Sequence, residues 1–180
     1  MLTVFVGVAL APESAKADGF VIPWVGGNAG SRSAAGLIDL GASVGATAAS
    51  VVDVDLDVSY SPDFFGNGLN SYVLTTMGNV TVGIPFGGTH APRIRPYLTG
   101  GVGLIRARIE DTRFGYSVAR NGLGVNFGGG VTGFLAAHLG VRADLRYIQS
   151  LGDNNSTNPF TQIDLGGFHY WRTSIGVVLR

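Results

Sequence analysis

Apolar and polar residues alternate with a period of two along most of this chain, which is the pattern of β-strands with two unlike faces. Residues 52–60 show it most clearly, because the even positions carry valine, leucine or tyrosine and positions 53, 55 and 57 carry aspartate. The alternation predicts strands over residues 19–30, 34–48, 52–60, 72–86, 96–110, 121–135, 139–147 and 169–180. No segment has the 3.6-residue periodicity of an amphipathic helix.

The segment 96–110 keeps its alternation only in parts. Its second half alternates three apolar residues with three charged ones: Ile105, Arg106, Ala107, Arg108, Ile109 and Glu110. A bulge at Gly100-Gly101 would correct the register, because one extra residue moves the following side chains to the other face. We therefore expect the three charged residues on the polar face of this strand.

The connections between these strands alternate as they do in an outer-membrane barrel, which has short periplasmic turns and longer outer loops. If the first strand runs outward, the inner turns fall near Ser50, at 87–95 and at 136–138. The outer loops then fall near Ser31, at 61–70, at 111–120 and at 150–167. The longest connection is thus on the outer side.

Composition favours a membrane location for such a barrel. Charged residues make up 13% of the chain, against roughly 25% in an ordinary soluble domain, and the mean hydropathy is +0.30. No run approaches the ~18 apolar residues of a transmembrane helix. The 29 glycines lie inside apolar segments, where they permit close packing in a narrow barrel.

Charge and cysteine usage exclude other classes of function. The formal net charge is +0 and there is no basic block, so we expect no nucleic-acid partner. The chain has no cysteine, which excludes disulfides and thiol chemistry.

Residues 1–17 have the features of a signal peptide. An apolar run is followed by Ala15-Lys16-Ala17, and we place cleavage between Ala17 and Asp18, so that residues 18–180 form the barrel domain. No Lys or Arg precedes the apolar run. The alternative is a first strand or a buried segment.

The aromatic residues recur near strand ends, as the interfacial girdles of a membrane barrel do. They are Trp24, Tyr60, Phe64, Phe65, Tyr72, Phe86, Tyr97, Tyr147, Phe168, Tyr170 and Trp171. The alternative is a soluble, lipocalin-like barrel whose aromatics cap a core. The polar faces favour the membrane, because they are rich in small residues and a water-exposed face would carry many Lys and Glu.

The charged residues of the polar faces are expected to pair across the lumen, because a buried charge is costly unless it is paired. The predicted network is Asp53, Asp55, Asp57, Arg106, Arg108, Glu110, Arg142, Asp144, Arg146 and Arg172. It plugs the barrel, or alternatively it lines a narrow ion path.

Several segments resemble the outer-membrane β-barrel domain family, which includes the OmpA-like and OmpX-like small barrels. They are DVDLDVSYSPDFFG (53–66), MGNVTVGIPFGG (77–88), RPYLTGGVGLIRARI (95–109), NFGGGVTGFLAAHLGVRADLRYI (126–148) and WRTSIGVVLR (171–180). The resemblance implies an all-β, eight-stranded antiparallel up-and-down transmembrane barrel in the bacterial outer membrane. It also implies contact with outer-membrane lipid and with the barrel-insertion machinery. That machinery usually reads a C-terminal aromatic residue, whereas this chain ends in Val178-Leu179-Arg180.

The remaining motifs do not predict a cofactor site, a metal site or a catalytic site. Residues 128–133 match G-x-G-x-x-G, but no helix follows, so no cofactor is expected. The three histidines are too scattered for a metal site, and His169 with Ser150 or Ser156 is the only catalytic set that can be assembled. We therefore expect a non-enzymatic envelope protein whose outer loops contact a host or surface ligand. A small passive pore is the main alternative, and a lipid-modifying enzyme or a soluble ligand-binding barrel are weaker ones.

Overall fold

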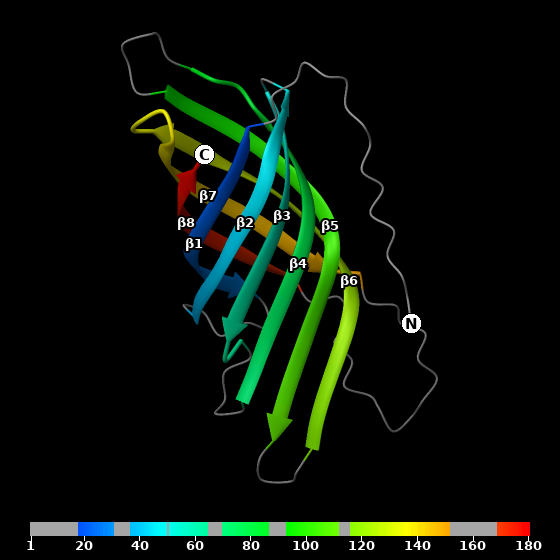
Figure 1. Cartoon of the computed structure of the whole chain (residues 1–180). Helices are drawn as coiled ribbons and strands as arrows, with labels where there is room; N and C mark the ends of the chain where they lie inside the picture. Colours follow the sequence, from blue (N-terminus) through cyan, green and yellow to red (C-terminus); the bar gives the residue numbers. More distant parts are fainter. Residues whose placement is uncertain are drawn as a thin grey trace.

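The computed structural model describes residues 18–30, 37–49, 51–64, 70–86, 93–111, 116–151 and 169–180. Eight strands follow one another in the described part of the chain: β1 (Gly19–Gly30), β2 (Leu37–Ala49), β3 (Val52–Pro62), β4 (Asn70–Gly83), β5 (Arg93–Asp111), β6 (Tyr116–Phe134), β7 (Leu139–Ser150) and β8 (His169–Leu179). Each strand pairs antiparallel with the next, and β8 pairs with β1 to close a barrel (Figure 1). The prediction of an eight-stranded up-and-down barrel is confirmed.

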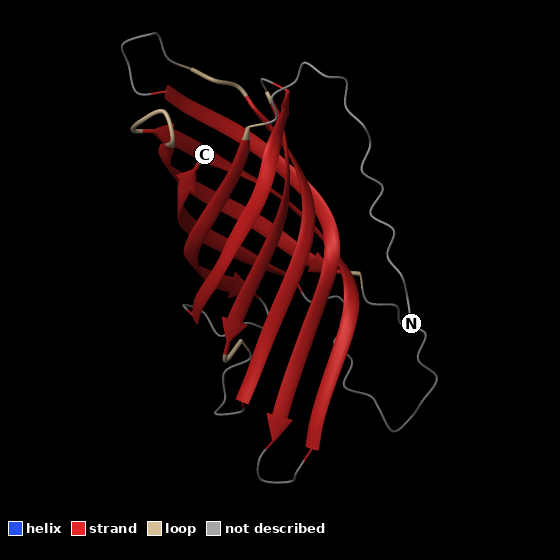
Figure 2. Cartoon of the chain, viewed as in Figure 1, coloured by secondary structure: helices blue, strands red, loops and turns tan. Residues whose placement is uncertain are grey.

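The described part of the barrel consists of strands and a few turns (Figure 2). Within the described ranges, the chain forms no helix long and apolar enough to cross a membrane. The strand ends that flank residues 50–51, 84–92 and 135–138 lie at one end of the barrel, which we call the turn end. The strand ends that flank residues 31–36, 63–69, 112–115 and 151–168 lie at the other, which we call the loop end. The expected signal peptide, residues 1–17, lies outside the described residues.

The register gives the tilt of the strands. A row of paired residues that starts at Phe20 on β1 passes through every strand to Tyr170 on β8 and returns to β1 at Gly30. The row has then moved ten residues toward the loop end. With a rise of about 3.3 Å per residue and about 4.8 Å between strands, this stagger corresponds to a tilt of about 41°.

The bulge expected at Gly100-Gly101 is absent, and this prediction is wrong. The pairing of β5 is continuous with β4 from Glu110 to Tyr97 and with β6 from Asp111 to Arg93. Ile105 and Ala107 therefore face the lumen and are buried, whereas Arg106 is exposed on the outer face. Arg106 lies in the part of the β5–β6 hairpin that continues past β7: the pairing of β6 with β7 stops at Gly124↔Ser150, whereas β4 stays paired with β5 as far as Glu110.

The outer surface is apolar over most of its height. The described outward-facing residues of the middle of the barrel carry no charge, and many are large and exposed, among them Val21, Val44, Leu56, Val80, Leu98, Val102, Leu145 and Ile175. Aromatic rings lie toward the loop end of this apolar band. The ring of Tyr147 packs against those of Phe127 and Trp171, with centroids 5.1 and 5.2 Å away, and Tyr60 packs against Tyr72 at 5.6 Å. This is the surface of a barrel surrounded by lipid.

Candidate functional site

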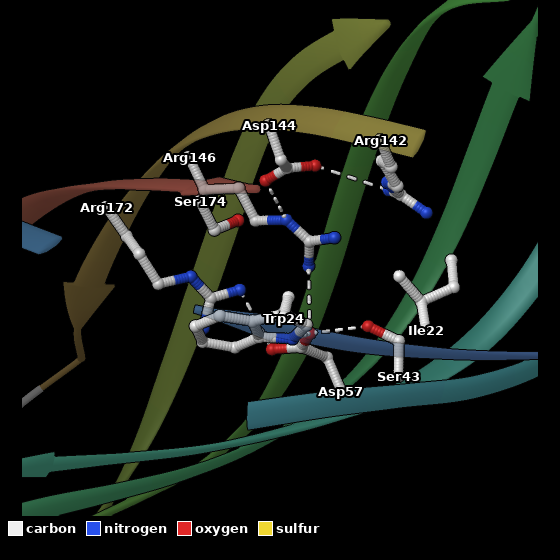
Figure 3. Close-up of a pocket in the computed structure, with 9 residues that line it drawn as sticks. All are labelled: Ile22, Trp24, Ser43, Asp57, Arg142, Asp144, Arg146, Arg172 and Ser174. Atoms are coloured by element: carbon white, nitrogen blue, oxygen red, sulfur yellow. Dashed lines mark hydrogen bonds and ion pairs between the residues drawn. The ribbon is translucent and has the colours of Figure 1, made fainter. Parts of the chain in front are cut away.

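The lumen is filled at mid-height by side chains that converge on Asp57 of β3 (Figure 3). Its Oδ1 accepts a hydrogen bond from Nη2 of Arg172 at 2.9 Å. Its Oδ2 accepts bonds from Oγ of Ser43 at 2.7 Å and Nε1 of Trp24 at 3.1 Å. The guanidinium of Arg172 also lies over the Trp24 ring, 4.3 Å from its centroid. Charge pairing and hydrogen bonds together offset the cost of burying this carboxylate.

A second carboxylate, Asp144 of β7, continues the network toward the turn end. Its Oδ1 accepts a bond from Nε of Arg146 at 2.7 Å, and Oδ2 accepts bonds from Nη2 of Arg142 at 3.3 Å and Oη of Tyr97 at 2.5 Å. Oη of Tyr97 in turn accepts a bond from Nε of Arg142 at 2.6 Å. Nη1 of Arg146 lies 4.0 Å from Oδ2 of Asp57, which links the two carboxylates.

The space among these side chains is small. Ile22 and Ser174 complete the lining of a cavity with room for little more than one water molecule. Nη1 of Arg146 and Nε and Nη1 of Arg172 make no hydrogen bond to the protein there, so a bridging water would satisfy them. The network therefore occupies the bore and leaves no wide aqueous space at this level.

Polar pairs flank the network on both sides. Toward the turn end, Arg95 Nη1 lies 2.7 Å from Asp53 Oδ2. Asp55 has no arginine partner among the described residues; its Oδ1 accepts a bond from Asn79 Nδ2 at 2.9 Å. Toward the loop end, Oδ1 of Asp39 accepts a bond from Ser61 Oγ at 2.9 Å.

Apolar clusters lie on both sides of the layer formed by Asp57 and Asp144. On the loop-end side, seven buried residues pack together: Phe64, Val73, Met77, Ile105, Ala107, Ile148 and Tyr170. The rings of Phe64 and Tyr170 meet edge to face, with centroids 5.0 Å apart. On the turn-end side, Phe20, Ile22 and Val178 pack together, with Phe134 against them. A charged layer between two apolar clusters is the arrangement of a filled core.

The structure brings together six of the ten residues expected in the lumen network. The six that form ion pairs are Asp53, Asp57, Arg142, Asp144, Arg146 and Arg172. Asp55 is buried beside them. Arg106 and Arg108 lie on the outer face of β5, because the expected bulge is absent, and the side chain of Glu110 lies outside the described residues.

Sequence reasoning missed Arg95 and Asp39, which are both buried in the lumen. The sequence predicts a turn at residues 87–95, which includes Arg95, and Asp39 stands in a Gly/Ala-rich segment with weak alternation. The signal for Arg95 was available, because it continues the odd positions of residues 97 and 99, which face the lumen.

Four aromatics expected at the membrane interface are buried inside the barrel: Trp24, Phe64, Tyr97 and Tyr170. Glycines on neighbouring strands give them room. A Cβ at Gly41 would overlap the Trp24 ring, and a Cβ at Gly130 would lie 2.5 Å from Tyr97 Oη. Tyr60, Tyr72, Phe86, Tyr147 and Trp171 are on the outer face, and Phe65 and Phe168 lie outside the described residues.

Among the described residues, the candidate catalytic pair His169 and Ser150 is not brought together. His169 is exposed, with its ring 5.6 Å from that of Tyr147, whereas Ser150 is buried on the lumen side of β7. Ser156 lies outside the described residues. The glycines of residues 128–133 lie within β6 and are followed by a turn and another strand. In the part of the chain that the structure describes, no three His, Asp or Glu side chains cluster as metal ligands.

Comparison with known proteins identifies the class of barrel. A model of the family described as outer membrane protein beta-barrel domain matches residues 1–169. The chain is similar in structure to neisserial surface protein A (NspA), with 16% identity and a TM-score of 0.69 over 92% of this chain and 99% of that one.

Two further structures share the fold. The N-terminal β-barrel domain of Pseudomonas aeruginosa OprF is 15% identical, with a TM-score of 0.55 over 91% of this chain and 100% of that one. Ail, the attachment invasion locus protein of Yersinia pestis, is 11% identical, with a TM-score of 0.54 over 89% of this chain and 97% of that one. No curated protein matches the chain in sequence.

Proposed function

The chain belongs to the outer membrane protein beta-barrel domain family and is located in the bacterial outer membrane, and from this premise we propose that it is a closed, non-enzymatic envelope barrel. Its loop end faces the outside and offers loops 61–70, 111–120 and 150–167 for contact or adhesion. The orientation rests on the longest connection, 151–168, which belongs to the loop end.

The observation that carries the proposal is the filled lumen. Asp57 and Asp144 pair with three arginines, of which Arg146 and Arg172 reach Asp57 across the bore, and apolar clusters lie on both sides of this layer. An eight-stranded barrel has an interior just wide enough for side chains. Ions would have to break buried ion pairs to pass, which is costly.

Single-channel recording tests this part of the proposal against the alternative of a passive pore. The folded barrel, identified by its heat-dependent mobility on a gel, is inserted into a planar lipid bilayer with a general porin as the positive control. We expect no conductance steps from this chain. Steady steps that fall in Arg142→Gln or Asp144→Asn would assign an ion path to the lumen and overturn the closed barrel.

The contact role draws support from the neighbours. Ail is named for attachment and invasion, and NspA is a surface protein. A variant in which residues 153–166 are replaced by a short Gly-Ser linker tests it. Cells that carry this variant should display a heat-modifiable barrel at the normal level but adhere less to a eukaryotic cell layer. Equal adhesion would remove the contact role from this loop.

A further inference from the structure

The buried charges of the lumen do not balance. The buried charged residues of the described chain are five aspartates and four arginines: Asp39, Asp53, Asp55, Asp57, Asp144, Arg95, Arg142, Arg146 and Arg172. With every carboxylate ionised, this set carries one more negative charge than positive charges. An uncompensated charge is costly where water does not reach it, because nothing solvates it there. The set therefore needs one further positive charge to be neutral.

Two of the five carboxylates lack an arginine partner among the described residues. Asp53, Asp57 and Asp144 each lie within 4.0 Å of a guanidinium nitrogen, and together they engage all four arginines. The other two, Asp39 and Asp55, each accept a hydrogen bond from a neutral side chain at Oδ1, whereas Oδ2 of each accepts none. The balancing positive charge therefore belongs at one of these two carboxylates.

A proton is the cation that fits there, because it needs neither a cavity nor a set of ligands. No three acidic or histidine side chains of the described ranges come together as metal ligands. The small cavity at mid-height lies among three guanidinium groups, which repel a cation. A carboxyl group needs only its own oxygen to hold a proton, and it then becomes a hydrogen-bond donor.

The charged groups around the two carboxylates differ. Asp39 is 0% exposed, and the charged groups that act on it are Arg172 and Asp57. Those two are bound to each other, with Nη2 of Arg172 2.9 Å from Oδ1 of Asp57, so that their charges largely offset one another (Figure 3). Asp55 is instead acted on by two guanidinium groups and one carboxylate. The surroundings therefore stabilise an ionised Asp55 more than an ionised Asp39.

The neutral groups that face Asp39 suit a protonated carboxyl. Oγ of Ser61 on β3 donates to Oδ1 of Asp39 at 2.9 Å and accepts from Nδ2 of Asn28 on β1 at 3.0 Å. The Asn28 amide also adjoins the Asp39 carboxyl, and its Oδ1 is a buried acceptor without a hydrogen bond. A proton on Oδ2 of Asp39 supplies a donor for that acceptor. The phenol of Tyr170 on β8, which also acts on Asp39, is uncharged below about pH 10.

We infer that Asp39 is a proton-binding site of the lumen, which takes up one proton on Oδ2 in mildly acidic medium and so makes the buried charge of the barrel neutral. Proton uptake favours the folded barrel, because water solvates the ionised carboxylate only in the unfolded chain. A mildly acidic medium therefore stabilises the barrel, and this stabilisation is lost as the pH rises and folded Asp39 releases its proton. The inference depends on neither the orientation of the barrel nor its surface contacts.

Nuclear magnetic resonance of the side-chain carboxyl carbons tests the site on the full folded barrel, because the resonance of this carbon moves when the carboxyl group is protonated. The aspartates are labelled with carbon-13, and each lumen resonance is assigned by its loss in Asp39→Asn or Asp55→Asn. Between about pH 8 and about pH 5, we expect the Asp39 resonance to move to the protonated position while that of Asp55 stays ionised. An Asp39 resonance that stays ionised, or an Asp55 resonance that moves in its place, would overturn the site.

Unfolding in guanidinium over the same pH range gives a second readout. Where the folded barrel holds the proton and the unfolded chain does not, the unfolding constant of the unaltered chain should rise by up to about tenfold per pH unit. Asp39→Asn has no proton to release there, so it should lack this part of the pH dependence. Asp63→Asn is the matched control, because it removes an exposed carboxylate, and it should keep the dependence. An equal pH dependence in Asp39→Asn and in the unaltered chain would contradict proton binding by Asp39.

Discussion

Arg146 of β7 and Asp57 of β3 approach to 4.0 Å in the middle of the barrel, although these two strands lie on opposite sides of it. The contact spans the bore, and Arg172 and Asp144 extend it on either side. The lumen of this protein is therefore organised as a protein core with charged residues at its centre. The pairing of these charges inside the lumen allows a chain with an apolar outer surface to carry buried charges.

Of the two carboxylates Asp57 and Asp39, Asp57 should contribute more to the free energy of unfolding of the barrel. Asp57→Asn leaves Arg146 and Arg172 without their shared anion, and breaking a buried ion pair costs about 3–5 kcal/mol. Asp39 is equally buried, but its described bond is to the neutral hydroxyl of Ser61. Asp39→Asn should therefore cost less than about 1 kcal/mol, because an amide oxygen can accept the same bond.

Equilibrium unfolding in guanidinium, with the barrel in lipid vesicles, measures the free energy of unfolding of each variant. If the ion pairs stabilise the barrel, Asp57→Asn should lose clearly more free energy of unfolding than Asp39→Asn. Equal losses in the two variants would mean that burial, and not pairing with arginine, decides the contribution of these residues.

The alternation of residues was sufficient to predict the strands and most of their faces. It placed Asp53, Asp55 and Asp57 inside because each side chain of β3 follows the period of two without interruption. It failed at residues 105–108, where the strand runs past the apolar band and the inner face becomes apolar while the outer face becomes charged. The rule that apolar residues face lipid reverses once a strand leaves the membrane.

Contacts across the lumen could not be predicted from the sequence, for a different reason. The pairing of Arg95 with Asp53, and of Trp24 with Asp57, depends on strand stagger, which follows from the register of all eight strands. Trp24 has the spacing of a strand-end aromatic, so its position inside the barrel depends on the space that Gly41 leaves on the next strand.

Glycines that face lumen side chains should tolerate no Cβ. In Gly41→Ala, the new methyl group would overlap the ring of Trp24 and the carbonyl of Val58. Overpacking of this kind costs roughly 1–3 kcal/mol. Gly133→Ala is the matched control, because a Cβ at Gly133 would meet nothing within 4 Å.

The comparison is made by guanidinium unfolding and by the change of tryptophan fluorescence that accompanies folding. Gly41→Ala should unfold at lower denaturant than the unaltered chain, and Gly133→Ala should match it. A stable Gly41→Ala barrel would show that Trp24 can move without loss and that the packing is not tight.

An arginine placed on the outer face should destabilise the barrel more, the closer it lies to the centre of the membrane. Leu56 lies near the centre of β3 and points outward, so Leu56→Arg should cost about 2–4 kcal/mol in a bilayer. Leu135 is 73% exposed in the turn between β6 and β7, at the membrane border, and Leu135→Arg should cost about 0–1 kcal/mol. Similar costs for the two variants in vesicles would contradict the position of the lipid band on this surface.

The closed lumen is tested most directly by thiol labelling, because the chain contains no cysteine of its own. Ser59 is buried in the lumen, where its hydroxyl lies 2.6 Å from that of Thr75, and Asp63 is exposed at the loop end. Ser59→Cys and Asp63→Cys barrels in vesicles are treated with a charged, membrane-impermeant thiol reagent. We expect Asp63→Cys to react completely while Ser59→Cys stays unmodified until the barrel is unfolded. Modification of Ser59→Cys in the folded barrel at a rate similar to that of Asp63→Cys would show a water-filled lumen and contradict the closed barrel.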